Sequence, residues 1–291
     1  MSGQDGFGGP WTEEKLDSVA SYLQAYTTAL KNQPFQLMYI DAFAGTGYRA
    51  VRQKGETVHG FFSLPQMTAL AKGSARRALE VDPAFDHYIF IEANPGRFQE
   101  LVQLEENFGS MRDRLTFKNQ EANAAIAKIC RDTDWRQTRA VLFLDPYGMQ
   151  VNWTTIEAIG AVRHIDLWYL FPVGTVQRLL QREGRISAGW KTALDRLLGD
   201  ASWRAEFYKT VCEPTLFGDR TRESKVANLP AIERYVRERL LEAFRGGVAR
   251  STLQLRNSKG SCMYLLFFAC GNPDPKAHGL ALKIAQHVLK S

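Results

Sequence analysis

The chain has 291 residues, of which 45% are hydrophobic and 23% charged, and its formal net charge is +6. This is the composition of an ordinary globular protein, and the sequence lacks the apolar run of about 18 residues that would span a membrane. Its N-terminal residues lack the basic and apolar regions of a secretory signal, so we expect a soluble, cytoplasmic protein. The positive charge favours a polyanionic partner only weakly, because it is spread over a large surface.

No sequence pattern supports metal or redox chemistry. The four cysteines, Cys130, Cys212, Cys262 and Cys270, lie far apart, and none forms the close pair that a zinc site or a redox dithiol needs. We therefore expect buried free thiols and no metal site.

Hydrophobic periodicity predicts an opening helix at residues 11–31, with Thr12 as its N-cap, and then a buried strand at residues 36–41. From residue 74 onward, helices and strands alternate regularly. The expected strands are 87–92, 115–118, 140–145 and 166–171, and the expected helices are 74–80, 95–108, 121–131 and 153–162. This alternation indicates a parallel sheet that is covered on both faces.

After residue 173 the pattern becomes helical only, with helices expected at 176–181, 189–198, 203–212 and 229–244. Strands are then expected at 250–255 and 262–270, joined by the turn-forming residues Asn257-Ser258-Lys259-Gly260, and a helix at 275–289. We predict an α/β, Rossmann-like class I methyltransferase fold. It would have a mostly parallel seven-stranded sheet, a terminal antiparallel hairpin and a helical insert after strand five. The predicted single domain covers 1–291, with its core at 11–173 and 248–291 and the insert at 174–247.

The turn after the first strand carries a candidate binding site. Its sequence is Asp41-Ala42-Phe43-Ala44-Gly45-Thr46-Gly47. In a doubly wound sheet, ligands bind beyond the carboxyl ends of the strands where the strand order reverses, usually beside the first strand. Gly45 and Gly47 allow positive φ and let a ligand approach the backbone. A Gly-x-Gly pattern alone does not identify that ligand.

Acidic residues follow the next two strands. Glu92 can accept both hydroxyls of a ribose, and Glu121 can contact an adenine amino group. The alternative is that these acids only cap neighbouring helices, and for Glu121 the two interpretations have equal weight. We predict a site for S-adenosylmethionine formed by Asp41, Phe43, Ala44, Gly45, Thr46, Gly47, Glu92, Ala93, Glu121, Ala122 and Asp145.

A nicotinamide site is the weaker alternative. Residues 45–50 also fit the pattern G-x-G-x-x-A, in which the ribose-binding acid follows the glycines by about 20 residues. Glu92 lies more than twice that distance away. No helix is expected directly after the glycines to bind a pyrophosphate, and S-adenosylmethionine has no phosphate to bind.

The apolar fourth strand ends in Asp145-Pro146-Tyr147-Gly148, which is similar to the Asp/Asn-Pro-Pro-Tyr/Phe of amino-group methyltransferases. The Asp145 carboxylate and the Pro146 carbonyl can accept both protons of an exocyclic amine and direct its lone pair toward a methyl group. Tyr147 can stack on a flipped or single-stranded base. These three residues are the predicted catalytic residues. A plain turn is the alternative, and the place of the segment at the methyl-transfer edge favours function.

Basic residues near this edge suit the phosphates of DNA or RNA, the expected substrate. Solvated helix faces explain them equally well. Besides Tyr147, the predicted substrate-binding residues are Arg49, Arg76, Arg77 and Arg178.

Together these residues resemble the three-Cys-motif partner proteins, which look like class I methyltransferases. The segments 41–47 and 145–148 carry the resemblance, with support from 11–15, Gly73-Ser74 and 257–268. Where many members have Asp-x-Asn after the third strand, this chain has Glu121-Ala122-Asn123. The resemblance implies a partner protein that holds the cysteine motif and looks like a radical S-adenosylmethionine enzyme. It leaves open an accessory role, in which this chain binds the cofactor without transferring methyl groups itself.

Overall fold

The computed structural model describes residues 10–45, 73–215 and 218–290. The chain opens with helix α1 (Pro10–Leu30), which is followed by strand β1 (Gln36–Asp41). Thr12, the predicted N-cap, lies inside α1, because the helix already begins at Pro10. Proline suits this position, since its φ is fixed at a helical value and its missing N–H has no helical acceptor there.

Helices and strands then alternate as predicted. In chain order they are α3 (Ser74–Leu79), β2 (His87–Ile91), α4 (Pro95–Val102), α5 (Leu104–Asn107), the 3-10 helix η1 (Gly109–Arg114), β3 (Leu115–Lys118), α6 (Ala122–Asp132), β4 (Thr138–Leu144), α7 (Trp153–Val162) and β5 (Ile165–Phe171). The single helix expected at 95–108 is divided at Gln103. The N–H of Gln103 bonds to the carbonyl of Glu100, three residues back, which tightens the turn between α4 and α5.

The seven-stranded sheet has the order β3-β2-β1-β4-β5-β9-β8, which confirms the predicted fold class. The first five strands are parallel, whereas β9 (Cys262–Cys270) is antiparallel to β5 and pairs with β8 (Leu253–Arg256). The chain winds outward from β1 in one direction to β3 and then in the other direction from β4. The carboxyl ends of β1 and β4 therefore flank the point where the strand order reverses.

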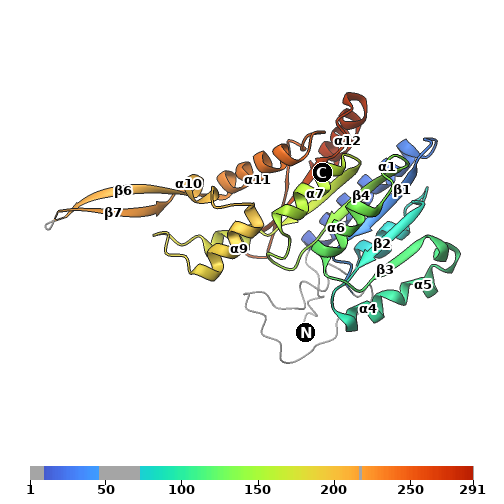
Figure 1. Cartoon of the computed structure of the whole chain (residues 1–291), viewed down its shortest axis with the longest axis horizontal. Coiled ribbons are helices and arrows are strands. Elements are labelled where there is room, and N and C mark those ends of the chain that lie inside the picture. The colour runs from blue at the N-terminus through green and yellow to red at the C-terminus, as the bar shows by residue number, and fades with distance from the viewer. Residues whose placement is uncertain (1–9, 46–72, 216–217, 291) are drawn as a thin grey trace, which may run out of the picture.

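Helices cover both faces of the sheet (Figure 1). On one face lie α1, α3 and α12 (Pro275–Val288), and on the other α6, α7 and the helices of the insert. Among the described helices, none is both long and apolar enough to cross a membrane.

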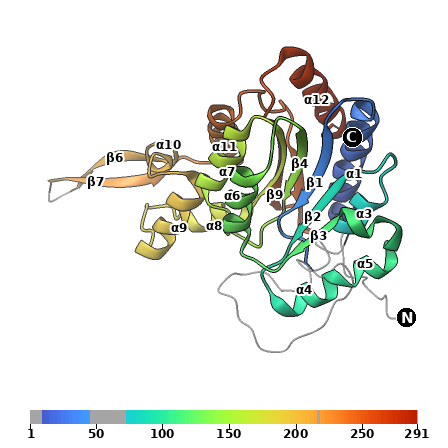
Figure 2. The same ribbon diagram turned by 45° about the vertical axis from the view of Figure 1, so that its right-hand side comes forward.

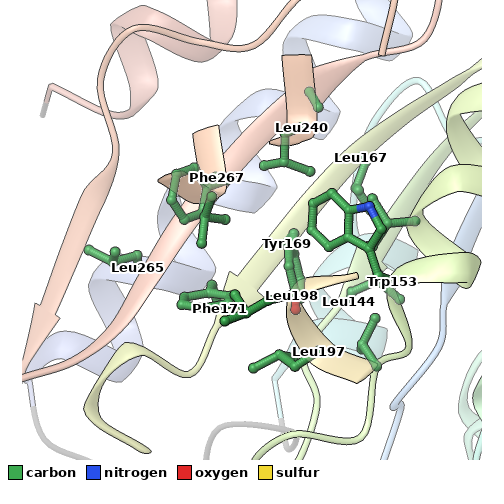
Figure 3. Packing of buried hydrophobic residues seen from close by; sticks show 14 of the residues in the cluster. Leu144, Trp153, Leu167, Tyr169, Phe171, Leu197, Leu198, Leu240, Leu265 and Phe267 are labelled. Carbon is green, nitrogen blue, oxygen red and sulfur yellow. The ribbon is translucent and has the colours of Figure 1, made fainter. Parts of the chain in front are cut away.

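Buried aromatic and aliphatic side chains join the insert to the sheet (Figure 3). Trp153 of α7 and Leu240 of α11 (Leu229–Ala243) pack with Tyr169 and Phe267 of the central strands. These four side chains are each no more than 3% exposed. The insert and the sheet therefore share one hydrophobic core. Burial of its apolar surface contributes about 25 cal/mol per Å2 to folding.

The prediction that the insert contains only helices was wrong. It consists of α8 (Val173–Leu179), α9 (Ala188–Leu198), α10 (Trp203–Phe207), β6 (Tyr208–Thr215), β7 (Gly218–Lys225) and α11. The helix expected at 203–212 ends at Phe207, and β6 and β7 pair as an antiparallel ribbon. Tyr208, Thr210 and Val211 favour extended backbone, and Pro214 cannot continue a helix. Figures 1 and 2 show this ribbon projecting from the body of the protein.

The contact of α7 with α11 requires a glycine. A Cβ at Gly160 would lie 2.3 Å from the backbone oxygen of Ala243, so we expect Gly160→Ala to lower the free energy of unfolding by about 1–3 kcal/mol. The matched control is Gly189→Ala in α9, where a Cβ meets no atom within 4 Å. It should gain up to about 1 kcal/mol from helix propensity. Urea denaturation measures the free energy of unfolding of both variants. Equal changes in Gly160→Ala and Gly189→Ala would contradict the close contact of α7 with α11.

Candidate functional site

The turn after β1 is fixed to both neighbouring strands. The N–H of Ala42 donates to the carbonyl of Phe143 in β4 (3.1 Å), and the N–H of Ala44 donates to that of Ile91 in β2 (3.0 Å). Gly45 then adopts a φ of 65°, which favours glycine. The turn thus lies where the strand order reverses, as predicted. Thr46 and Gly47 lie outside the described residues.

Asp41 is a fully buried carboxylate at the start of this turn. Its Oδ1 accepts a hydrogen bond from the N–H of Phe43 (3.2 Å), whereas its buried Oδ2 has no partner among the described residues. Burial raises the pKa of Asp41 to about 7, although the Ser74 hydroxyl and the Phe43 N–H oppose the rise. An unpaired buried carboxylate oxygen of this kind has the capacity to bind a donor from a ligand.

Asp145 stands at the end of β4 in a buried ion pair with Lys15 of α1. The Lys15 ammonium lies 2.6 Å from Asp145 Oδ2, and its side chain is 0% exposed. It also lies over the ring of Phe143, 5.4 Å from the ring centroid. Lys15 is a site residue that was not predicted from the sequence. The signal was present, because Lys15 shares the apolar stripe of α1 with Val19 and Tyr22, where an unpaired lysine is costly.

The segment after Asp145 is held by a short chain of hydrogen bonds. Pro146 is buried, and the N–H of Tyr147 donates to Gln150 Oε1 (3.1 Å). Gln150 in turn accepts a bond from the side chain of Asn123 in α6 (2.9 Å). Gly148 has a φ of 70° and lets the chain turn away from the sheet. The Asp-Pro-Tyr-Gly segment is therefore both a turn and a fixed feature of the strand edge.

Tyr147 is covered on one face of its ring. The guanidinium of Arg97 lies 4.9 Å from the ring centroid, and sequence analysis did not identify this partner. The hydroxyl of Tyr147 is buried without a hydrogen-bond partner among the described residues, and burial raises its pKa. Tyr147 therefore offers a second unsatisfied polar atom, besides Asp41 Oδ2, at the same edge of the sheet.

Glu92 follows β2 and is 5% exposed. Its Oε1 accepts the N–H of Asn94 (2.7 Å), and its backbone carbonyl and that of the exposed Ala93 accept bonds from Asn119. These contacts hold the Glu92 carboxylate at the carboxyl end of β2, next to the turn that follows β1.

Glu121 is the N-cap of α6, in agreement with the structural interpretation of this acid. Its two oxygens accept the N–H groups of Asn123 (3.0 Å) and Ala124 (2.9 Å). Ala122 is buried at the first position of the helix. The proposed contact of Glu121 with adenine stays a prediction.

The predicted basic residues are only partly gathered at this edge. Arg76 pairs with Glu80 (2.7 Å) and Arg77 with Asp17, so these two arginines form ion pairs on the surface. Arg178 lies in α8, where burial lowers its pKa, and it is close enough to Tyr264 of β9 for the two to affect each other electrostatically. Arg49 lies outside the described residues.

The edge of the sheet therefore combines three carboxylates, those of Asp41, Glu92 and Asp145, with one fully buried ammonium, that of Lys15. Such an excess of carboxylates suits a ligand that carries positive charge, and the unpaired oxygens of Asp41 and Tyr147 suit one with polar groups. S-adenosylmethionine, which has a sulfonium, an ammonium and a ribose, fits these residues.

The fold is similar to that of solved structures. Protein LPL1258 from Legionella pneumophila has 12% sequence identity and a TM-score of 0.50, over 97% of this chain and 93% of that one. An S-adenosylmethionine-dependent methyltransferase from Clostridium acetobutylicum has 10% identity and a TM-score of 0.37, over 88% and 92%. The glycopeptide N-methyltransferase MtfA, in complex with S-adenosyl-L-homocysteine, has 12% sequence identity and a TM-score of 0.34, over 86% of this chain and 89% of that one.

At 12% identity, the similarity to LPL1258 establishes the fold and nothing about the chemistry. No family model and no curated protein matches the sequence. The resemblance to the three-Cys-motif partner proteins therefore stays a prediction.

Replacing Lys15 tests the buried ion pair. In Lys15→Met the Asp145 carboxylate is left without its partner, so we expect the free energy of unfolding to fall by about 3–5 kcal/mol. The double variant Lys15→Met/Asp145→Asn strands no charge and should recover part of this loss. Urea denaturation of Lys15→Met, Asp145→Asn and the double variant yields the coupling energy of the pair.

The control is Arg112→Met, which removes an exposed ion pair with Glu105 and should lower the free energy of unfolding by less than about 1 kcal/mol. An equally small loss in Lys15→Met would refute the role of this pair.

Titration of Asp41 should make stability depend on pH. Its folded pKa of about 7 exceeds the value of 3.8 for an exposed carboxyl, so its favourable contribution is complete below pH 3.8 and is lost as the pH rises through 7. Asp41→Asn removes this dependence. We expect the variant to gain about 2 kcal/mol on the wild type between pH 5.5 and pH 8. Thermal or urea unfolding at the two pH values measures the difference, and a constant difference would contradict the raised pKa.

Proposed function

We propose that this protein is an S-adenosylmethionine-dependent methyltransferase that acts on an exocyclic amino group of a nucleic acid base. The observation that carries the proposal is the position of Asp145-Pro146 at the end of β4, beside the buried Asp41 at the end of β1. Register pairs Asp41 with Phe143, so Asp145 lies just beyond the pair at the same edge. The proposed acceptors for an amine therefore lie at the same edge as the residues proposed to bind the methyl donor.

The residues proposed to hold the cofactor are those of the 41–47 turn together with Glu92 and Glu121. Bound there, S-adenosylmethionine supplies a methyl group on a positively charged sulfur, which keeps the bonding electrons when the methyl leaves. Asp41 Oδ2 is suited to accept an N–H of the cofactor ammonium, because it is buried and has no other partner among the described residues. Glu92 is suited to accept the ribose hydroxyls, since the Asn94 N–H occupies only part of its accepting capacity.

Lys15 determines how Asp145 meets the substrate. It occupies Oδ2 at 2.6 Å, which leaves Oδ1 to accept one amino proton while the carbonyl of Pro146 accepts the other. The amine then presents its lone pair to the methyl group. Once methylated, the nitrogen is a strong acid, so even a carboxylate that is paired with a lysine is basic enough to take its proton.

The nucleic acid substrate is supported by charge and by aromatic surface. Residues 174–247 contain fourteen Lys and Arg against ten Asp and Glu, which is +4 of the net charge of +6. The turn between β8 and β9, with the exposed Lys259, lies at the same edge as Asp145 because β9 runs antiparallel to β5. The face of Tyr147 that Arg97 does not cover is proposed to stack on the base.

Transfer of radiolabelled methyl groups from S-adenosylmethionine onto fractionated DNA, RNA and protein tests the proposal. We expect label in a nucleic acid fraction. Asp145→Asn should lower the rate by at least about 100-fold, because it removes the charged acceptor and proton carrier. Its affinity for S-adenosylhomocysteine, measured by calorimetry, should change less than about threefold. The matched control is Asp132→Asn, which alters an exposed aspartate at the end of α6.

Undiminished turnover in Asp145→Asn would exclude the role given to this residue. Cofactor binding without label in any fraction would instead favour the accessory role that acts through a partner protein. Label in protein alone would keep the enzyme and overturn the nucleic acid substrate.

A further inference from the structure

A cavity lies at the opposite edge of the sheet from the candidate site. It has a volume of about 480 Å3 and is bordered by the start of β4, the start of β5 and the end of β9. Strand β4 separates it from Asp145, and its seven residues span about 20 Å. The cavity is therefore distinct from the site proposed for the cofactor. Its size falls within the range of about 300–1,000 Å3 that is usual for small-molecule pockets.

The walls of this cavity are apolar. The last turns of α1 contribute Tyr26 and Leu30, and one face of α12 contributes Leu280 and Ile284. These positions recur at helical spacing, so each helix presents a continuous apolar face to the cavity. Leu280 lines the cavity and is 47% exposed. The two helices pack together in the core, and the cavity is lined by residues of both.

Two basic side chains that line the cavity, Arg139 and Lys276, form no ion pair within the described residues. Arg139 donates through Nη1 to the carbonyls of Trp135 (3.0 Å) and Thr138 (2.9 Å), and its guanidinium lies 4.7 Å from the ring centroid of Phe35. Within the part of the chain that the structure describes, neither Arg139 nor Lys276 at the rim pairs with a carboxylate. Burial lowers the pKa of Arg139, as expected of a guanidinium that is partly removed from water without a counter-ion.

The acidic groups around the cavity are already engaged. Asp166 accepts a hydrogen bond from the hydroxyl of Tyr22 (2.8 Å), and Asp274 caps α12 by accepting the N–H groups of Lys276 and Ala277. His164 adds an unsatisfied group, because its buried Nδ1 has no partner among the described residues. The donors of Arg139 and Lys276 thus remain available to an anion from outside the chain.

We propose that this cavity is a binding site for a small amphipathic anion, with a carboxylate or sulfonate head on Arg139 and an apolar body between α1 and α12. The anionic head accepts hydrogen bonds from the N–H groups of Arg139 that do not bind the carbonyls of Trp135 and Thr138. Lys276 adds a second positive charge. The body covers Leu280 and Ile284. This site is independent of the proposed methyl transfer.

Fluorescence titration of the full chain with anilinonaphthalene sulfonate, an aromatic sulfonate, tests the site. We expect one saturable site, from which decanoate displaces the probe. Decyltrimethylammonium, a cation of similar length, and S-adenosylhomocysteine should not displace it. Arg139→Met should raise the dissociation constant by at least about tenfold, because a charge-assisted hydrogen bond is lost.

Two further variants separate a loss of binding from a loss of folding. Leu280→Glu changes an exposed side chain, so folding should be preserved, while its negative charge at the rim should weaken binding by about fivefold or more. The matched control is Arg136→Met, which alters an exposed arginine just before β4. Arg136 pairs with Asp134, and its replacement should leave the dissociation constant within twofold. Four outcomes would each overturn the proposal. They are no saturable binding, equal affinity in Leu280→Glu and the wild type, equal displacement by the cation, and displacement by S-adenosylhomocysteine.

Discussion

The buried contact between the Lys15 ammonium and the Asp145 carboxylate joins the first helix to the end of a strand 130 residues later. Taking two charges out of water costs several kcal/mol each, and each charge is tolerable only in the presence of the other. The pair thus fixes α1 against the edge where β1 and β4 end. It also occupies Oδ2 of Asp145, so that Oδ1 is the oxygen left for the proposed substrate. The stability of this edge and its proposed chemistry therefore depend on the same contact.

Much of the fold follows from local patterns in the sequence. The strands around Ile40, Ile89 and Leu142 are short apolar runs bounded by turn residues, and they appear within two residues of their predicted limits. The ribbon at 208–225 does not follow from such patterns. Most of its residues are polar, and among its described side chains only Tyr208 belongs to the core, so no clear period emerges. Thr210 and Val211 favour a strand only weakly, and Pro214 disfavours a helix.

The candidate site, too, could be predicted from the sequence only in part. Acids at the ends of successive strands were found from the sequence, because parallel strands bring their carboxyl ends to one edge. Their roles differ in ways that only the contacts reveal. Both carboxylate oxygens of Glu121 accept N–H groups at the start of α6. Glu92 accepts only the N–H of Asn94, and Asp41 Oδ2 has no partner among the described residues. Lys15 lies 130 residues before its partner Asp145, and Arg97 lies about fifty residues before its partner Tyr147, so neither contact could be predicted from proximity in the sequence.

The position of β9 between β5 and β8 has a consequence for synthesis of the chain. Asp166 of β5 pairs with Cys270 of β9, about a hundred residues further along, and the whole insert lies between them. Until the C-terminal segment has been made, the long apolar edge of β5 has no partner on that side. A nascent chain with such an open edge is exposed to aggregation. We therefore expect β5 to be the part of the sheet most exposed to wrong pairing before β9 joins it.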